Sequence, residues 1–259
     1  MTERGMSAPE ISIVIPAFNE ARRLPESIAR LKAYQATRPR IGEVIVVDDG
    51  STDGTSSVVE GLAREWPMLR LVRAAHRGKG GAVRVGVLEA AGTYIALADA
   101  DFSMPVEQFD RFSAPALGAY DIAIGSREAP GARRFDEPGY RHLMGRGFNA
   151  LVRVVLLPGI QDTQCGFKCM RRDVAIDLCQ HQTIDGWGFD VELLYIARLR
   201  GYRVVEVPVS WYYAPGSRVN PIRDTVTMVR DVLTIRRNGK RGCYDIQTVT
   251  VPAQSQMSR

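Results

Sequence analysis

This sequence of 259 residues has little histidine and cysteine, no long apolar run and no large excess of one charge. The three histidines, His76, His142 and His181, lie far apart and form no ligand pair or triad, which disfavours chemistry that needs a histidine as proton carrier. The four cysteines lack the close paired spacing of a zinc site. A chain of this length needs no disulfide bonds for stability, so we expect a reduced, cytosolic protein.

The absence of long apolar runs bears on membranes. No stretch reaches the ~18 uncharged apolar residues of a membrane-spanning helix, and the N-terminus MTERGMSAPE has no apolar core of a signal peptide. We therefore expect a soluble or peripheral protein. The 34 Lys and Arg residues against 29 Asp and Glu residues give a net charge of +5, which suits phosphates, nucleic acid or acidic lipid heads without choosing among them.

Short apolar runs alternate with helical patterns along much of the chain. Strands are predicted at 11–16, 43–47, 69–73, 94–98, 121–125 and 203–209. Helices are predicted between the first four strands, and later at 140–157 and as an amphipathic segment at 221–237. The alternation indicates one α/β domain over residues 10–240, with a mixed, mostly parallel sheet flanked by helices. We expect flexible tails at 1–9 and 247–259.

Polar segments follow three of the predicted strands. Asn19 and Glu20 follow the first strand, Asp48 and Asp49 follow the second, and the motif DAD at 99–101 follows the fourth. Ligands bind at the carboxyl ends of the strands in open α/β sheets, so these segments should converge on one crevice. The polar loop at 127–138 is expected to be a flexible element over that crevice.

The DAD motif is a candidate metal site. Asp99 and Asp101 are two residues apart, so in an extended segment both carboxylates point to the same side. Mg²⁺ and Mn²⁺ prefer oxygen ligands and are often shared between carboxylates and substrate phosphates. Such an ion would offset charge on a departing diphosphate. The alternative is a pair of solvated loop aspartates, because DxD occurs often by chance.

Two further loops are candidates for binding a nucleotide. Asp48 is the better candidate to accept hydrogen bonds from a base or ribose, whereas Asp49 has about even odds of being a turn-former. The segment HRGKGG opens a helix, where backbone N–H groups can approach an anion and Lys79 can meet a phosphate. A plain surface loop is the alternative. The segment is neither a Walker loop nor a dinucleotide fingerprint.

Several segments together carry a family resemblance. Four of them resemble the family-2 glycosyltransferases of GT-A fold: IPAFNE at 15–20, VVDDGSTDGT at 46–55, GKGGAVRVG at 78–86 and DADFS at 99–103. Three more look like those of polyprenyl-phosphate sugar synthases: IGSR at 124–127, QDTQCGFK at 161–168 and GWGFDVELLYIA at 186–197. The resemblance is greatest to dolichyl-phosphate β-glucosyltransferases, with dolichyl-phosphate mannosyltransferases second. It covers about residues 10–240.

The resemblance implies an inverting transfer of a sugar from UDP-glucose or GDP-mannose to a polyprenyl or dolichyl monophosphate. It implies nucleoside contacts from Pro16, Phe18, Glu20 and Asp48, and binding of metal and diphosphate by Asp99 and Asp101. It also implies phosphate binding by Arg127, Arg141 and Arg218, a task that suits the planar guanidinium.

Three further positions lie in or beside the segments that carry the resemblance. Ser103 stands where the mannosyltransferase pattern often has a Gln as third metal contact, so the sequence departs from that pattern there. Asp190 and Glu192 would lie near the acceptor. Helix capping and structural pairing are the alternative for both.

A lipid acceptor needs a route from the membrane. We expect peripheral docking on its cytoplasmic face through the apolar side of 140–157, with Arg141, Arg146 and Arg153 beside it and the run RRNGKR at 236–241 assisting. A core helix is the alternative. The implied partners are a nucleotide sugar, a lipid phosphate and a membrane surface, and no nucleic acid.

Two other functions compete with this one. The first is transfer to a soluble or polysaccharide acceptor, although the QxxRW signature of processive polymerases is absent. The second is a non-catalytic nucleotide-sugar-binding protein, which the intact pair Asp99 and Asp101 disfavours.

Overall fold

The computed structural model describes residues 10–38, 40–112, 120–213 and 221–245, and gives only the backbone of 221–224. The predicted tails at 1–9 and 247–259 and the candidate Arg218 lie outside the described residues. Within the described part, no helix is both long and apolar enough to cross a membrane.

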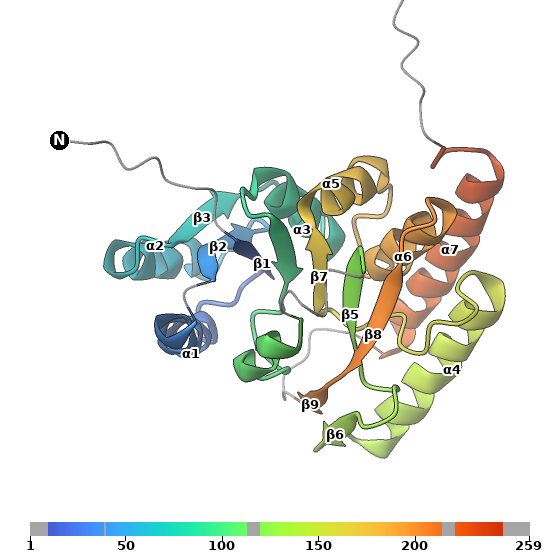
Figure 1. The fold of residues 1–259 in the computed structure, drawn as a ribbon, viewed down its shortest axis with the longest axis horizontal. Coiled ribbons are helices and arrows are strands. Elements are labelled where there is room, and N and C mark those ends of the chain that lie inside the picture. Colours follow the sequence, from blue (N-terminus) through green and yellow to red (C-terminus); the bar gives the residue numbers. More distant parts are fainter. Residues whose placement is uncertain (1–9, 39, 113–119, 214–220, 246–259) are drawn as a thin grey trace, which may run out of the picture.

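A seven-stranded sheet forms the centre of the molecule (Figure 1), in the order β3-β2-β1-β4-β7-β5-β8. Its strands are β1 (Ile11–Ala17), β2 (Ile41–Asp48), β3 (Leu69–Arg73), β4 (Tyr94–Leu97), β5 (Ile122–Ser126), β7 (Lys168–Arg171) and β8 (Val204–Pro208). Strand β7 is antiparallel to both of its neighbours, and every other pairing in this sheet is parallel. A separate parallel pair joins β6 (Arg133–Phe135) to β9 (Ser210–Tyr212).

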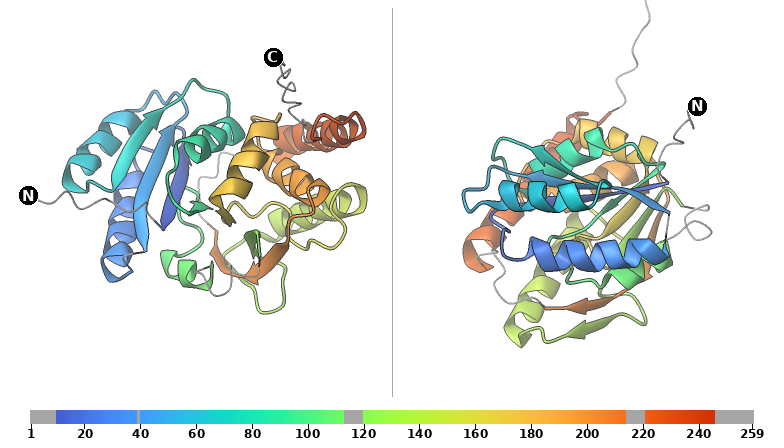
Figure 2. Two further views of the ribbon diagram at one scale, coloured as in Figure 1. Left: turned by 45° about the horizontal axis from the view of Figure 1, so that its top comes forward. Right: turned by 90° about the vertical axis from the view of Figure 1, so that its left-hand side faces the viewer.

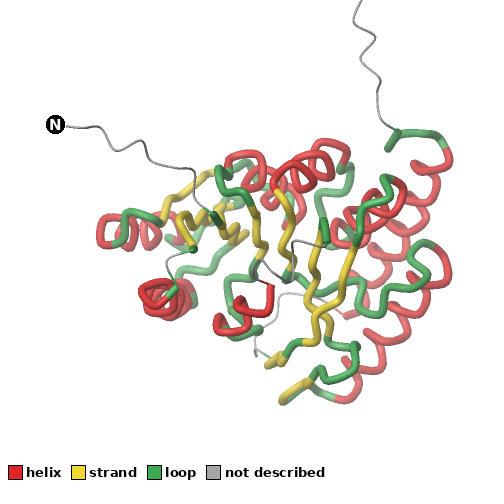
Figure 3. Tube along the Cα trace, in the orientation of Figure 1, coloured by secondary structure: helices red, strands yellow, loops and turns green. Residues whose placement is uncertain are grey.

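Helices cover both faces of the sheet (Figure 2). They are α1 (Leu24–Thr37), α2 (Thr55–Glu65), α3 (Lys79–Glu89), α4 (Gly139–Val155), α5 (Arg172–His181), α6 (Phe189–Leu199) and α7 (Pro221–Lys240), with a 3₁₀ helix η1 at Val106–Phe112. Loops of varied length join the strands and helices (Figure 3), the longest between described elements being the one from α4 to β7. Side chains alternate across each strand, so Val14 packs into one core with α3, while Ile13 and Ile15 pack into the other with α1.

The structure confirms the predicted fold class, and all six predicted strands are present within a few residues of their predicted bounds. The sequence did not predict β6, β7 or β9. The loop predicted as a flexible element at 127–138 contains β6, and Arg134 ties it together through ion pairs of 2.5 Å to Glu128 and 2.8 Å to Glu137.

The antiparallel strand sets the position of the site. Strands β1, β2, β4 and β5 run in one direction, so their carboxyl ends lie at one edge of the sheet. Because β7 runs the other way, the loop that precedes it reaches the same edge. Residues 161–167 therefore lie beside the segments that follow β4 and β5, at the same edge as those that follow β1 and β2.

Candidate active site

A cavity of about 940 Å³ opens at this edge of the sheet. Its walls come from the segments after β1, β2 and β4, the start of α3, the loop before β7, α4, the start of α6 and β9. The lining includes these predicted site residues: Pro16, Phe18, Glu20, Lys79, Asp99, Asp101, Arg127 and Arg141; Ser103 lies there as well. Eight of the ten predicted site residues, all but Asp48 and Arg218, thus share one cavity.

An aromatic pair lies at one end of the lining. The rings of Phe18 and His76 stack with centroids 4.3 Å apart and an interplanar angle of 22°. Nδ1 of His76 lies 2.9 Å from the carbonyl oxygen of Asp49, which can only accept, so this nitrogen carries the proton. Gly50 has φ +73°, and a Cβ there would lie 3.0 Å from Cβ of His76. The glycine therefore allows the two loops to meet.

The two aspartates after β2 have different surroundings. Asp48 is buried; its carboxylate accepts a 2.8 Å hydrogen bond from the N–H of Ser51 and another from the hydroxyl of Ser56. It therefore holds its own turn and is absent from the cavity lining. Asp49, interpreted from the sequence as a turn-former at even odds, lines the cavity. The role of Asp48 as a nucleoside contact stays a prediction, and the geometry favours Asp49.

The glycine-rich segment already binds an anion of the chain itself. Oδ1 of Asp49 accepts from the N–H of Arg77 and Oδ2 accepts from the N–H of Gly78, both at 2.9 Å. The N–H of Gly81 donates to the carbonyl of Asp185 at 3.1 Å. These three amides are therefore engaged, whereas the side chain of Lys79 lines the cavity, where it can meet a ligand.

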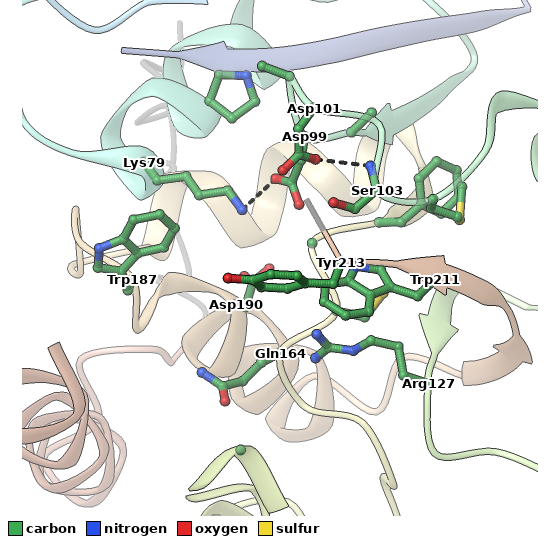
Figure 4. A pocket seen from close by; sticks show the side chains of 18 of the residues that line it. Lys79, Asp99, Asp101, Ser103, Arg127, Gln164, Trp187, Asp190, Trp211 and Tyr213 are labelled. Atoms are coloured by element: carbon green, nitrogen blue, oxygen red, sulfur yellow. Dashed lines mark hydrogen bonds and ion pairs between the residues drawn. The ribbon is translucent and has the colours of Figure 1, made fainter. Parts of the chain in front are cut away.

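Lys79 links the segment to the DAD motif. Its Nζ lies 2.6 Å from Oδ1 of Asp99, and Figure 4 shows both groups on one wall of the cavity with Asp101 beside them. Burial alone would lower the pKa of Lys79, but the charges of Asp99 and Asp190 outweigh this and raise it. Burial likewise opposes ionisation of Asp99, yet Lys79 holds its pKa below the ordinary value. Both groups are therefore charged near neutral pH.

The donor set of the DAD motif fits a hard divalent cation. Asp99 and Asp101 supply carboxylate oxygens from one wall, and Oδ1 of Asp101 accepts a 3.0 Å hydrogen bond from the N–H of Ser103. No group of three or more His, Cys, Asp or Glu side chains that could hold a metal occurs among the described residues. Two carboxylates suit an ion that takes its remaining oxygens from water and a diphosphate.

Arg127 faces the motif from the opposite side of the cavity (Figure 4). It forms a two-pronged ion pair with Asp162, through Nε at 2.8 Å and Nη2 at 3.0 Å. Burial opposes the charge of Asp162, but the guanidinium lowers the pKa of its carboxyl to about 2. Asp162 therefore balances the charge of Arg127. The sequence interpretation missed this partner, which lies 35 positions further along the chain.

The guanidinium of Arg141 packs over an aromatic ring. Its carbon lies 5.4 Å from the ring centre of Tyr213, and Arg127 lies 5.6 Å from that of Trp211. Nε of Arg141 is buried and has no hydrogen-bond partner among the described residues. Sequence reasoning missed both aromatic residues, which β9 brings to the cavity from 70 or more positions further along the chain.

A buried ion pair lies behind the cavity wall. Nζ of Lys168, the first residue of β7, donates to Asp190 and to the carbonyl of Cys165. Burial raises the pKa of Asp190 despite the two lysines near it. Asp190 lines the cavity, whereas Glu192 is fully buried and does not.

Comparisons with known proteins agree with this geometry. A family model described as "Glycosyl transferase family 2" matches residues 12–179. The dolichyl-phosphate β-glucosyltransferase of Drosophila melanogaster is 38% identical over 247 residues, which cover 87% of this chain and 74% of that protein. The Homo sapiens enzyme of the same name is 34% identical over 255 residues, covering 92% and 78%.

Solved structures match the fold. Glucosyl-3-phosphoglycerate synthase from Mycobacterium tuberculosis, in complex with Mn²⁺, UDP-glucose and phosphoglyceric acid, superposes with a TM-score of 0.64 at 19% identity. The match covers 88% of this chain and 80% of that one. The likeness confirms the predicted GT-A architecture.

Proposed function

This chain belongs to glycosyl transferase family 2, and we propose that it transfers glucose from UDP-glucose to a polyprenyl monophosphate of the dolichyl phosphate type. One observation carries the proposal: the DAD carboxylates, Lys79, and the arginines Arg127 and Arg141 line the same cavity. The names of the relatives support glucose and dolichyl phosphate. The UDP-glucose bound by the M. tuberculosis synthase supports the donor.

The donor would lie across the loops that follow the parallel strands β1, β3 and β4. The stacked rings of Phe18 and His76 offer an aromatic surface for a nucleobase. Lys79 is a charged donor at the start of α3, where the helix dipole also favours a phosphate. Pro16 and Glu20 lie in the same stretch of wall and remain the predicted nucleoside contacts.

Asp99 and Asp101 would hold Mg²⁺ or Mn²⁺, and the Mn²⁺ in the M. tuberculosis synthase supports this assignment. When bound, the ion supplies Lewis-acid stabilisation of the diphosphate that leaves. Lys79 adds a second positive charge on the same wall. Their combined effect is to make UDP a better leaving group.

The acceptor would enter from the side of Arg141. A phosphate monoester is anionic near neutral pH, so its oxygen attacks the anomeric carbon directly and no side chain has to remove a proton. The new C–O bond forms as the bond from that carbon to UDP breaks, which inverts the configuration. Nε of the Arg141 guanidinium has no partner among the described residues, while Arg127 is held by its ion pair with Asp162.

The outer side of α4 supports docking on the cytoplasmic face of a membrane. The exposed large apolar side chains of this helix are Tyr140, Leu143, Met144, Leu151 and Val154. At 3.6 residues per turn they fall within about 100° of arc, and Arg146 and Arg153 border that stripe. The adjoining side of α4 is core, because Phe148 and Val152 are buried. The two sequence interpretations of this helix thus apply to its two sides.

Basic residues continue this surface onto α7, which packs along α4 (Figure 1). The run at 236–241 covers the end of α7, with Arg237 and Lys240 in the last turn of the helix and Arg241 just after it. Anionic head groups attract such residues. The stripe adjoins the cavity, since Met144 belongs to both.

A donor and acceptor screen tests the proposal. Purified protein with Mn²⁺ is incubated with radiolabelled UDP-glucose or GDP-mannose, with and without dolichyl phosphate. We expect label to pass into the organic phase only with UDP-glucose and the lipid phosphate together. Transfer to a soluble acceptor, with all label left in water, would replace the lipid acceptor by the competing one.

A further inference from the structure

We propose that Tyr244 and Glu192 form a positioning pair, through which α7 orders the segment 182–188 at the wall of the cavity. The segment carries Gly186 and Trp187, both of which line the cavity. The inference deepens the proposed function, because it assigns residues that hold the transferase site in shape. Both Glu192 and Tyr244 lie beyond residues 12–179, the part matched by the family model.

Glu192 is the centre of the pair. Its side chain is fully buried in the first turn of α6, and both carboxylate oxygens accept hydrogen bonds from the segment. Oε2 accepts from the N–H of Thr183 at 3.0 Å and of Ile184 at 2.8 Å, and Oε1 accepts from the Thr183 hydroxyl at 2.6 Å. Buried carboxylate oxygens are costly without such donors, so these hydrogen bonds favour one conformation of the segment.

Tyr244 supplies the remaining donor from a distant part of the chain. Its hydroxyl, in a side chain that is buried, donates to Oε1 of Glu192 at 2.6 Å. Asn238, in the last turns of α7, donates to the Thr183 hydroxyl at 3.2 Å. The end of α7 and the residues just after it thus close the cluster around the start of the segment.

Helix α7 also meets the other end of the segment. A Cβ on Gly188 would lie 2.5 Å from Oδ2 of Asp231, which shows how closely this helix approaches the first turn of α6. The Asp231 side chain therefore packs directly against Gly188. Contacts from one helix therefore hold both ends of a segment of seven residues.

The middle of the segment lies against the donor side of the cavity. Nζ of Lys79 is 5.5 Å from the ring centre of Trp187. Asp185 accepts from the N–H of Gly81 through its carbonyl and forms a 2.9 Å ion pair with Arg84. A change in the segment would therefore move the ring beside Lys79, the residue that contacts Asp99.

Hydrogen exchange tests the positioning without relying on activity. In Tyr244→Phe we expect the amides of Thr183 and Ile184 to exchange about tenfold faster, because Glu192 loses a donor and binds them less tightly. Peptides from β1 and β2 serve as an internal control and should exchange as in the wild type. Tyr195→Phe, a neighbouring ring on α6, is the matched variant and should leave 183–184 unchanged. Equal exchange in wild type and Tyr244→Phe would overturn the pairing.

A double-mutant cycle tests the link to the site. We expect Tyr244→Phe to lower kcat/KM for the donor about tenfold in the wild-type background and less than twofold in a Trp187→Ala background. Full additivity of the two changes would mean that Tyr244 acts on stability alone and would overturn the positioning role. Absence of glucosyl transfer by the wild type would refute the proposed function, while the exchange result would still decide whether the pair orders the segment.

Discussion

Gly166 approaches Asp99 so closely that a Cβ on the glycine would lie 2.5 Å from Oδ2 of the carboxylate. Gly166 lies in the loop that the antiparallel strand β7 brings to the site. The lack of a side chain there leaves room for the carboxylate in the orientation that Lys79 contacts. The glycine therefore belongs to the surroundings that orient a proposed metal ligand.

Gly166→Ala should weaken metal binding while preserving the fold. The methyl group displaces the Asp99 carboxylate, and such changes around a metal ligand cost roughly 10- to 100-fold in affinity. The measurement is the Mn²⁺ concentration that gives half-maximal activity. Gly145→Ala is the matched control, because Gly145 also lines the cavity but a Cβ there meets nothing within 4 Å. Equal Mn²⁺ dependence of the two variants would contradict the steric argument.

Asp101→Asn should lower turnover by roughly 100-fold or more, since Lewis-acid stabilisation amounts to several kcal/mol. The amide keeps the shape of the side chain, so the circular dichroism spectrum should match that of the wild type. Asp173→Asn, at an exposed carboxylate paired with Arg171 outside the cavity lining, is the control. Turnover like that of the wild type in Asp101→Asn would refute the metal role.

The ion pair of Asp162 and Arg127 should make stability depend on pH. Arg127 lowers the pKa of Asp162 from 3.8 to about 2, so the stabilisation is complete above the ordinary value and disappears as the pH falls towards the lower one. Asp162→Asn should therefore be less stable than the wild type at pH 7, by about 2 kcal/mol. In urea unfolding the difference should shrink steadily below about pH 4. Parallel curves for the two proteins would exclude this linkage.

The apolar stripe of α4 should bind vesicles of phosphatidylcholine and phosphatidylserine. Leu143 is 73% and Val154 85% exposed, and burial of each side chain in lipid is worth about 1.5–3 kcal/mol. Leu143→Ser/Val154→Ser should therefore reduce co-sedimentation at least tenfold. The control Met68→Ser/Leu88→Ser removes exposed apolar side chains elsewhere. Equal losses in both double variants would argue against docking through α4.

Cys243 should be the one cysteine that reacts rapidly with a thiol reagent at pH 8. Cys243 is exposed and the other three are buried. Burial raises the pKa of Cys165 to about 11 and those of Cys169 and Cys179 to about 12, which suppresses the reactive thiolate. A colorimetric assay should therefore titrate one thiol in the native protein and four in denaturant. Cys243→Ser should abolish the fast phase.

The parallel strands were predictable because they are rich in apolar residues, and β1 and β2 contain continuous apolar runs. Strand β7 was not, since its sequence KCMR begins and ends with a basic residue. Lys168 is buried there because Asp190, 22 residues away, accepts from it. No local pattern reveals a partner at such a distance.

The candidate site likewise contains residues that the sequence predicted and residues that it did not. The DAD motif and Lys79 were predictable, because short motifs after strands place them at the cavity. Which of Asp48 and Asp49 faces the cavity depends on the loop at 76–78, which supplies the donors for Asp49. The aromatic residues Trp211 and Tyr213 reach the site through β9. No sequence pattern predicts the pairing of β9 with β6.

The reversed strand has a consequence for how the chain matures. Because β7 separates β4 from β5, both of those strands have an unpaired edge until residues 168–171 emerge from the ribosome and insert. An unpaired strand edge invites association with other chains. Polypeptides that end before residue 168 should therefore aggregate, whereas those that extend past Arg171 can fill the gap between β4 and β5.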